Sequence, residues 1–171
     1  LLGDGTVKPR SVQFYNNNEK LLERVEHLMK ELFGLKSTRT NANTVESVRT
    51  DSKVLRDLLI HLGFPETEKS LNCFIPEKVM KGSENTVSAF LRGYFLADGH
   101  FNEYEAEIAT SSQQMQEDLA YALTRIGITP RVRRKETDRN THFRVRFSGD
   151  QLIEFHVKLG ADYDKFNQIE S

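Results

Sequence analysis

The sequence predicts a mixed α/β or α+β fold in which one structural unit occurs twice. Helical and strand-like patterns alternate along the chain, which is typical of that class. A chain of 171 residues, 37% of them hydrophobic, is long enough for one compact domain or for two small halves that share a core. The same order of apolar stripes and glycines recurs in both halves, which predicts an internal duplication.

The duplication is clearest when Asp4 is aligned with Asp98. One apolar stripe with the spacing of a single helix face then falls on another. The two stripes are Leu21, Val25, Leu28, Met29 and Leu32, and Met115, Leu119, Ala122, Leu123 and Ile126. The glycines that follow the helices also align in order, which indicates a common plan for the two halves.

Each half begins with an apolar helical segment that ends in Asp-Gly. This segment is LLGDG at residues 1–5 in the first half and SAFLRGYFLADG at residues 88–99 in the second. A strand follows, at residues 11–15 or 106–110. A helix comes next, over residues 18–34 or 113–127, and its final glycine suits a left-handed cap.

The remainder of each half is a strand pair and a closing helix. The strand pairs are expected at residues 35–41 with 44–51, and at 128–137 with 141–148; the closing helices are expected at 53–63 and 150–160. Residues 76–86, which contain Pro76 and Gly82, read as a linker between a first repeat at 1–75 and a second at 87–171. Ser83 or Asn85 is expected to cap the next helix.

Positive charge is concentrated in the second strand pair, although the net charge of the chain is only −1. Strand alternation turns Phe143, Val145 and Phe147 to one side and Arg144 and Arg146 to the other. On the partner strand, Arg131, Arg133 and Lys135 share one face. Acidic residues are concentrated elsewhere, as in NEYEAEI, so a basic sheet face is predicted; an ordinary solvated strand face is the alternative.

The two Asp-Gly segments predict a metal site. Gly93 and Ala97 lie on one helix face, which lets the equivalent helix of the other repeat approach closely. Such packing would bring the two acids together at the negative ends of two helices, and a divalent cation would relieve their repulsion. Oxygen ligands suit Mg²⁺ better than zinc. Beside a basic sheet face, the reaction that fits is metal-assisted phosphodiester hydrolysis.

The segment LRGYFLADG, residues 91–99, resembles the signature of the LAGLIDADG homing endonucleases, and it retains Leu91, Gly93, Ala97, Asp98 and Gly99. LLGDG resembles the end of the other copy, so the natural N-terminus is expected upstream. The resemblance covers essentially the whole chain and is greatest to two-motif, single-chain enzymes of inteins. It implies an α+β fold of two pseudo-symmetric αββαββα repeats that pack through paired LAGLIDADG helices, with a β-sheet saddle for DNA.

The resemblance also implies roles for individual residues. Asp4 and Asp98 would bind Mg²⁺ or Mn²⁺, together with carbonyl oxygens at Gly3 and Ala97. Lys69 and Lys165 would assist catalysis by stabilising developing negative charge or by orienting the attacking water. Asn17 and Ser111, which follow the first strands, would order water, although a polar residue there also suits a helix cap.

Double-stranded DNA is the implied partner, bound in its major groove by the sheet faces. The candidate contacts are Lys36, Arg39, Arg49, Arg131, Arg133, Lys135, Arg144 and Arg146. Sequence does not separate arginines that read guanine from those that contact phosphates. The second hairpin is longer than the first, which indicates an asymmetric target.

The sequence therefore predicts a monomeric, intracellular, site-specific double-strand DNA endonuclease. No apolar run reaches the length of a membrane span, and the single Cys73 excludes an intrachain disulfide and a cysteine-rich zinc site. One alternative is a non-cleaving nucleic-acid-binding protein of the same fold, an intron maturase or a transcription regulator. Another is a duplicated structural domain with no role in DNA binding.

Overall fold

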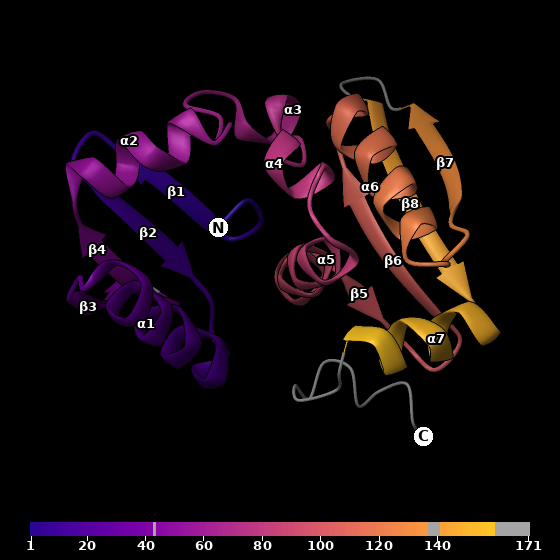
Figure 1. Ribbon diagram of the computed structural model, residues 1–171, viewed down its shortest axis with the longest axis horizontal. Coiled ribbons are helices and arrows are strands. Elements are labelled where there is room, and N and C mark those ends of the chain that lie inside the picture. The colour runs from indigo at the N-terminus through magenta and orange to yellow at the C-terminus, as the bar shows by residue number, and fades with distance from the viewer. Residues whose placement is uncertain (43, 137–140, 160–171) are drawn as a thin grey trace. The chain divides into compact units, whose positions relative to one another are not determined.

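A computed structural model describes residues 1–42, 44–136 and 141–159 (Figure 1). The chain forms two compact units, the first comprising Leu1–Glu66 and the second beginning at Thr67. Each unit contains a four-stranded antiparallel sheet with helices packed on one face. The α+β class and the duplication are therefore confirmed.

The first unit begins with a helical turn at residues 1–4. Its elements are then β1 (Gly5–Lys8), β2 (Ser11–Tyr15), α1 (Glu19–Phe33), β3 (Ser37–Ala42), β4 (Val45–Asp51) and α2 (Lys53–His61). The sheet order is β1-β2-β4-β3. Residue patterns alone indicate one strand before α1, whereas the αββαββα pattern implies two. The structure has two, β1 and β2.

The second unit repeats this plan after two short helices. Its elements are α3 (Lys69–Asn72), α4 (Glu77–Met80), α5 (Glu84–Asp98), β5 (His100–Phe101), β6 (Glu105–Thr110), α6 (Gln113–Arg125), β7 (Arg131–Glu136), β8 (Thr141–Ser148) and α7 (Asp150–Leu159). The sheet order β5-β6-β8-β7 is equivalent to that of the first unit. The register agrees as well, because Gln13 pairs with Arg49 and the aligned Glu107 pairs with Arg146.

The core of the first unit lies between its sheet and the two helices. Val12 packs with Met29 of α1 and Leu55 of α2, while Phe14 and Val48 pack around Leu22. The predicted α1 stripe is only partly right. Leu22 is fully buried whereas Leu32 is 64% exposed, so the face of α1 that packs on the sheet is rotated from the expected one.

The core of the second unit is built around four phenylalanines. Phe155 of α7 lies with its ring centroid 4.9 Å from that of Phe95 on α5 and 4.8 Å from that of Phe147 on β8. Phe101 of β5 completes the group, at 5.9 Å from Phe95. Tilted and edge-on pairs of this kind contribute about 0.5–1.5 kcal/mol each beyond the burial of area. Every residue of the predicted α6 stripe is buried.

The segment expected as a linker packs along α6. The main-chain NH of Ile75 donates to Asp118 Oδ2 at 2.9 Å, and Ser112 Oγ donates to the carbonyl of Cys73 at 2.6 Å. Arg125 donates to the carbonyl of Gly82 at 2.9 Å. These bonds place residues 73–82 in the second compact unit, so the units divide earlier than the predicted repeats, whose own boundaries stay a prediction.

Polar side chains cap the helices as the sequence indicates. Asn18, Ser52, Ser83 and Ser112 each accept a hydrogen bond from the main chain three residues on. Of the two residues expected to cap α5, Ser83 does so. Gly34 follows α1 with a φ of 64°, the left-handed conformation that favours glycine.

Candidate metal-binding helix ends and nucleic-acid interface

The Asp-Gly ends of the two units have the same local geometry. Gly5 N donates to the carbonyl of Leu1 at 2.9 Å, and Gly99 N donates to the carbonyl of Phe95 at 2.9 Å. A Cβ at either glycine would lie 2.4 Å from that carbonyl oxygen. Only glycine therefore fits after the acid in both units. The glycine lets the chain turn directly from the helix end into a strand.

The Asp4 carboxylate is held by the end of strand β2. Asn16 Nδ2 donates to Asp4 Oδ2 at 2.7 Å, and Asn16 Oδ1 accepts from Asn18 N at 2.9 Å. Tyr15 N donates to the main-chain carbonyl of Asp4 at 2.9 Å. Asp4 is half-buried, so both its main chain and its side chain have a defined direction. Such a fixed carboxylate suits a metal ligand.

The Asp98 carboxylate is exposed at the end of α5, beside the buried Tyr94. Burial raises the pKa of Tyr94, and the nearby Cys73 and the negative charge of Asp98 add to the effect. Burial also raises the pKa of Cys73, while the positive charge of Lys69 opposes this. Lys69, Cys73, Tyr94 and Asp98 are thus electrostatically linked within the second unit. Lys69 acts on Cys73 and Asp98 acts on Tyr94, so both predicted residues lie around one pair of buried side chains.

The donors at each helix end fit a hard divalent cation. Each end carries one carboxylate, from Asp4 or Asp98, directly after Gly3 or Ala97 in the chain, and carboxylate and main-chain carbonyl oxygens are the ligand types that Mg²⁺ prefers. Among residues 1–42, 44–136 and 141–159, no three His, Cys, Asp or Glu side chains gather at one place. Lys165, the second predicted lysine, lies outside the described residues.

The outward face of the second sheet carries the predicted cations. Phe143, Val145 and Phe147 point into the core, which confirms the alternation on β8. Arg144 and Arg146 point the other way, and register aligns them with Arg133 and Arg131 of β7. Lys135 continues the β7 row, opposite His142.

Two acids share this outward face, contrary to the expectation that acidic residues lie elsewhere. Arg144 Nη1 lies 3.3 Å from Glu107 Oε1, and Arg146 Nη1 lies 3.6 Å from Glu105 Oε2. Both glutamates belong to β6, which is paired directly with β8. The face is therefore basic along β7 and partly neutralised along β8.

The outward face of the first sheet is largely uncharged at its centre. Gln13 Nε2 donates to Ser47 Oγ at 2.9 Å, and Lys8 Nζ donates to Gln13 Oε1 at 3.1 Å. Arg49 lies on this face but its guanidinium pairs with Asp51 at 2.8 Å. Lys36 is exposed just before β3. Gln13 and Ser47 are buried, so the centre of the first face holds internally hydrogen-bonded amide and hydroxyl groups where the second face carries arginines.

Arg39 was expected on the DNA-binding face, and its position corrects that expectation. It pairs in register with the buried Val48, so it points to the side on which α1 packs. Its guanidinium donates to Glu26 at 2.8 and 2.9 Å and to Glu19 at 3.0 and 3.1 Å. These bonds raise its pKa, the hydrogen bond to Glu26 most of all. Arg39 therefore joins β3 to α1.

The two residues proposed to order water have different surroundings, and neither is the helix cap. Asn17 Nδ2 donates to the Thr44 carbonyl at 3.3 Å and its Oδ1 accepts from Glu46 N at 3.2 Å, so it braces the first hairpin. Ser111 Oγ lies 3.0 Å from His142 Nδ1 on β8. A role in ordering water stays a prediction for both.

Sequence reasoning did not single out Asn16, Tyr94, Glu105 or Glu107. Strand alternation could have located the glutamates on the outward face, since Glu105 and Glu107 alternate with the buried Ala106 and Ile108. Asn16 meets Asp4 only because β1 pairs with β2, which no local pattern indicates.

No helix among the described residues combines the length and the apolar character needed to cross a membrane. Comparison with known proteins relates the chain to archaeal sequences. It is 34% identical over 164 residues to an A-type ATP synthase subunit of Pyrococcus abyssi, covering 95% of this chain and 16% of that protein. It is 31% identical over 167 residues to the replication factor C small subunit of Thermococcus kodakarensis, covering 95% and 19%. The chain thus spans less than a fifth of these relatives.

Solved structures show the same fold. Mesophilic variants of the homing endonuclease I-DmoI match with a TM-score of 0.71 at 15% identity, covering 94% of this chain and 90% of that one. I-DmoI in complex with DNA and Ca also matches with a TM-score of 0.71, at 15% identity, covering 94% and 82%. A family model described as "LAGLIDADG-like domain" matches residues 1–63 and 85–160, one copy on each unit. Because that match covers most of the chain and both of its Asp-Gly helix ends, the chain belongs to the LAGLIDADG-like domain family.

Proposed function

We propose that this chain is a site-specific endonuclease that cuts both strands of duplex DNA with the help of a divalent cation. The observation that supports this most strongly is the repeated helix end. Both units place an acid, Asp4 or Asp98, before a glycine that no other residue can replace without a clash. The complex of I-DmoI with DNA and Ca supports the choice of partner and of a divalent cation.

Asp4 and Asp98 are the proposed ligands of Mg²⁺ or Mn²⁺, with the main-chain carbonyls of Gly3 and Ala97. When bound, such a cation lowers the pKa of a bound water and stabilises the leaving oxygen. Asn16 holds the Asp4 carboxylate in one direction through the 2.7 Å hydrogen bond. Lys69 is proposed to stabilise developing negative charge beside Asp98. Lys165 is proposed for the same role on the resemblance alone.

The outward sheet faces are the proposed DNA contacts. On the second sheet these are Arg131, Arg133, Lys135, Arg144 and Arg146. On the first sheet they are Lys36 and Arg49, whereas Arg39 is left out because it is bound to α1. The two faces carry different side chains, which supports a long, asymmetric target. Acting on DNA as a single chain, the enzyme is proposed to work inside the cell.

We further propose that the chain is the endonuclease part of an intein. Nearly its whole length matches a segment of an A-type ATP synthase protein and also a segment of a replication factor C protein. The same short module inside hosts of different function indicates an insertion. This is tested by expressing the gene together with its natural flanking sequences and analysing the products by mass spectrometry. A spliced host protein is expected, and an unspliced precursor that still contains this chain would contradict the proposal.

The nuclease proposal is tested with a plasmid library that carries randomised duplex inserts. The wild-type chain should linearise a subset of plasmids in Mg²⁺ or Mn²⁺ and none in EDTA. Asp98→Asn should slow cleavage of the selected site by about 100-fold or more, since several kcal/mol of charge stabilisation are lost. Binding to the same DNA in EDTA should persist. Glu117→Gln, an equal charge change at an exposed site on α6, is the matched control and should cut normally.

Undiminished cleavage by Asp98→Asn would refute the assignment of Asp98. Selective binding by the wild-type chain without cleavage in either metal would instead favour the non-cleaving DNA-binding alternative. Binding that is weak and independent of salt would point to a structural domain with no DNA role, because phosphate contacts make binding strongly salt-dependent.

A further inference from the structure

The cations on the outward face of the second sheet fall into two groups. Arg144 and Arg146 lie on β8, which has a strand on either side, while Arg131, Arg133 and Lys135 lie on β7 at the sheet edge. The central pair is matched with acids, as described above. The edge group forms no ion pair among the residues that the structure describes. The same face therefore holds one group of cations paired with carboxylates and one group without an ion pair among the described residues.

The central pair is held by diagonal contacts across β6 and β8. Arg144 is directly opposite Ala109 and reaches Glu107 at 3.3 Å, and Arg146 is directly opposite Glu107 and reaches Glu105 at 3.6 Å. Diagonal neighbours on one sheet face are within reach of long side chains. The side chain of Arg146 is 24% exposed, so its direction is restricted by the sheet as well as by Glu105.

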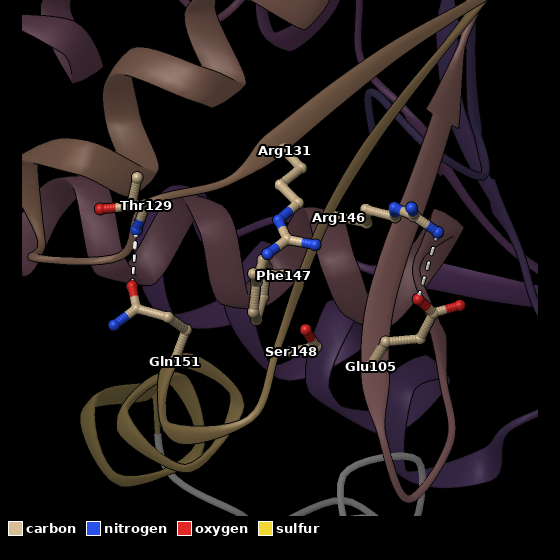
Figure 2. A pocket seen from close by; sticks show the side chains of 7 residues that line it. All are labelled: Glu105, Thr129, Arg131, Arg146, Phe147, Ser148 and Gln151. Atoms are coloured by element: carbon tan, nitrogen blue, oxygen red, sulfur yellow. Dashed lines mark hydrogen bonds and ion pairs between the residues drawn. The ribbon is translucent and has the colours of Figure 1, made fainter.

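The contrast between the two groups is visible at one end of the face. Arg131, Arg146 and Glu105 line a hollow of about 200 Å³, together with Thr129, Phe147, Ser148 and Gln151. Figure 2 shows the Arg146 side chain turned toward Glu105, whereas no dashed line joins Arg131 to any residue drawn. Two arginines that are partners in register thus have different surroundings.

This difference has a consequence for DNA binding. A cation contributes to phosphate binding by replacing condensed counterions, and an adjacent carboxylate cancels much of that gain. The same carboxylate draws the guanidinium to one side, through a single contact of 3.3 or 3.6 Å, and leaves its other N–H groups to donate. A fixed fork of two donors is what recognition of guanine O6 and N7 requires.

We propose that Arg144 and Arg146 read guanine edges in the major groove, with Glu107 and Glu105 as their positioning residues, and that Arg131, Arg133 and Lys135 contact phosphates. This rests on the proposed binding of duplex DNA but not on its cleavage. The glutamates reduce attraction to DNA of any sequence, and they restrict each central arginine to one direction. Discrimination between sites therefore increases while non-specific affinity falls.

The test measures binding in EDTA, which separates it from catalysis. Glu107→Gln and Glu105→Gln should each strengthen binding to a random duplex at low salt and steepen the log–log salt dependence by about 0.9, the value for one added phosphate contact. Preference for guanine at the position read by the matched arginine, measured by selection from a randomised library, should fall by about threefold or more.

The control is Glu136→Gln. Glu136 pairs with Arg134 at 2.8 Å on β7, but this pair lies on the other face, since Arg134 is opposite the inward Phe143. The variant removes the same charge from the same sheet, so it should leave the salt slope and the base preference unchanged. A second comparison uses the arginines themselves. Arg144→Ala should lose guanine preference at one position by roughly 5- to 150-fold, whereas Arg133→Ala should weaken all sites alike.

Unchanged salt slopes and base preferences in both glutamate variants would overturn the inference, as would equal shifts in Glu136→Gln. Retained guanine preference in both Arg144→Ala and Arg146→Ala would overturn it too. If the wild-type chain enriches no sequence at all, this inference and the site-specific function both fail. If it enriches a site but never cuts it, only the nuclease proposal fails.

Discussion

Replacing Gly99 by alanine tests the helix end on which the candidate metal site depends. The added methyl group would lie 2.4 Å from the carbonyl oxygen of Phe95 and 2.9 Å from its ring carbon Cδ1. Unstrained carbon contacts lie at about 3.5–4.0 Å, so the backbone must shift by a substantial fraction of an ångström. Phe95 cannot retreat, because it is fully buried among Phe101, Phe147 and Phe155.

Overpacking of this kind costs typically about 1–3 kcal/mol. Alanine also lowers the conformational entropy of the unfolded chain, which offsets about 0.4–1 kcal/mol of this loss of stability. We therefore expect Gly99→Ala to lose about 1–2 kcal/mol of unfolding free energy. Gly93→Ala on the same helix is the comparison, since a Cβ there meets no atom of its own unit within 4 Å. Helix propensity favours alanine there by about 0.5–1 kcal/mol, so a loss of stability in Gly93→Ala would indicate that the helix of the other repeat packs on Gly93.

Urea unfolding followed by tyrosine fluorescence and far-ultraviolet circular dichroism measures both variants, and the slope m should stay constant. Gly99→Ala should also cleave selected DNA more slowly than the wild-type chain, because Asp98 moves with the backbone. A Gly99→Ala chain within about 0.5 kcal/mol of wild type would refute the reasoning, since the expected loss is larger than that.

Two further predictions concern residues away from the metal ligands. Arg39→Met should lower the unfolding free energy by about 1 kcal/mol through loss of the Glu19 and Glu26 contacts, yet leave the Kd for selected DNA within about twofold; a tenfold loss would contradict its position on the helix side. Burial raises the pKa of Tyr94 in the folded chain. As the pH rises, the unfolded chain therefore loses the Tyr94 proton near pH 10, before the folded chain does. The contribution of Tyr94 to the free energy of unfolding should therefore be fully present below about pH 10. Above that pH it should fall by at most about 1.4 kcal/mol per pH unit. Urea titrations should show a shallower fall for Tyr94→Phe; parallel curves would contradict this.

The fold was largely predictable because the duplication supplies two independent readings of one pattern. Apolar spacing located α6 and β8, since Leu119 and Val145 occupy positions that only burial explains. The α1 stripe was less well predicted because apolar residues lie on more than one face of that helix. Leu32 had the expected spacing but is exposed, and Leu22 fills the space between Phe14 and Val48 instead.

The charges on the sheets were less predictable, because cross-strand register decides which side chains meet. Glu105 and Arg146 are far apart in sequence and become neighbours only when β6 pairs with β8. The placement of Arg39 did have a local signal. Arg39 lies four residues after Leu35 and therefore on the same side of the strand. Because Leu35 packs against the core, alternation indicates that Arg39 faces α1.

The two sheets show why a duplicated frame can serve an asymmetric partner. Inward positions stay apolar in both units, as at Phe14 and the aligned Ile108, because each is enclosed by helices. Outward positions differ between the units: Gln13 aligns with Glu107, and Ser47 with Arg144. The first unit buries Gln13 and Ser47 in a hydrogen-bonded group, whereas the Arg144 side chain is exposed, so the two faces offer a partner different chemistry. Divergence on the outward face therefore changes what each unit can recognise while the packing, the register and the glycine-dependent helix ends remain common to both.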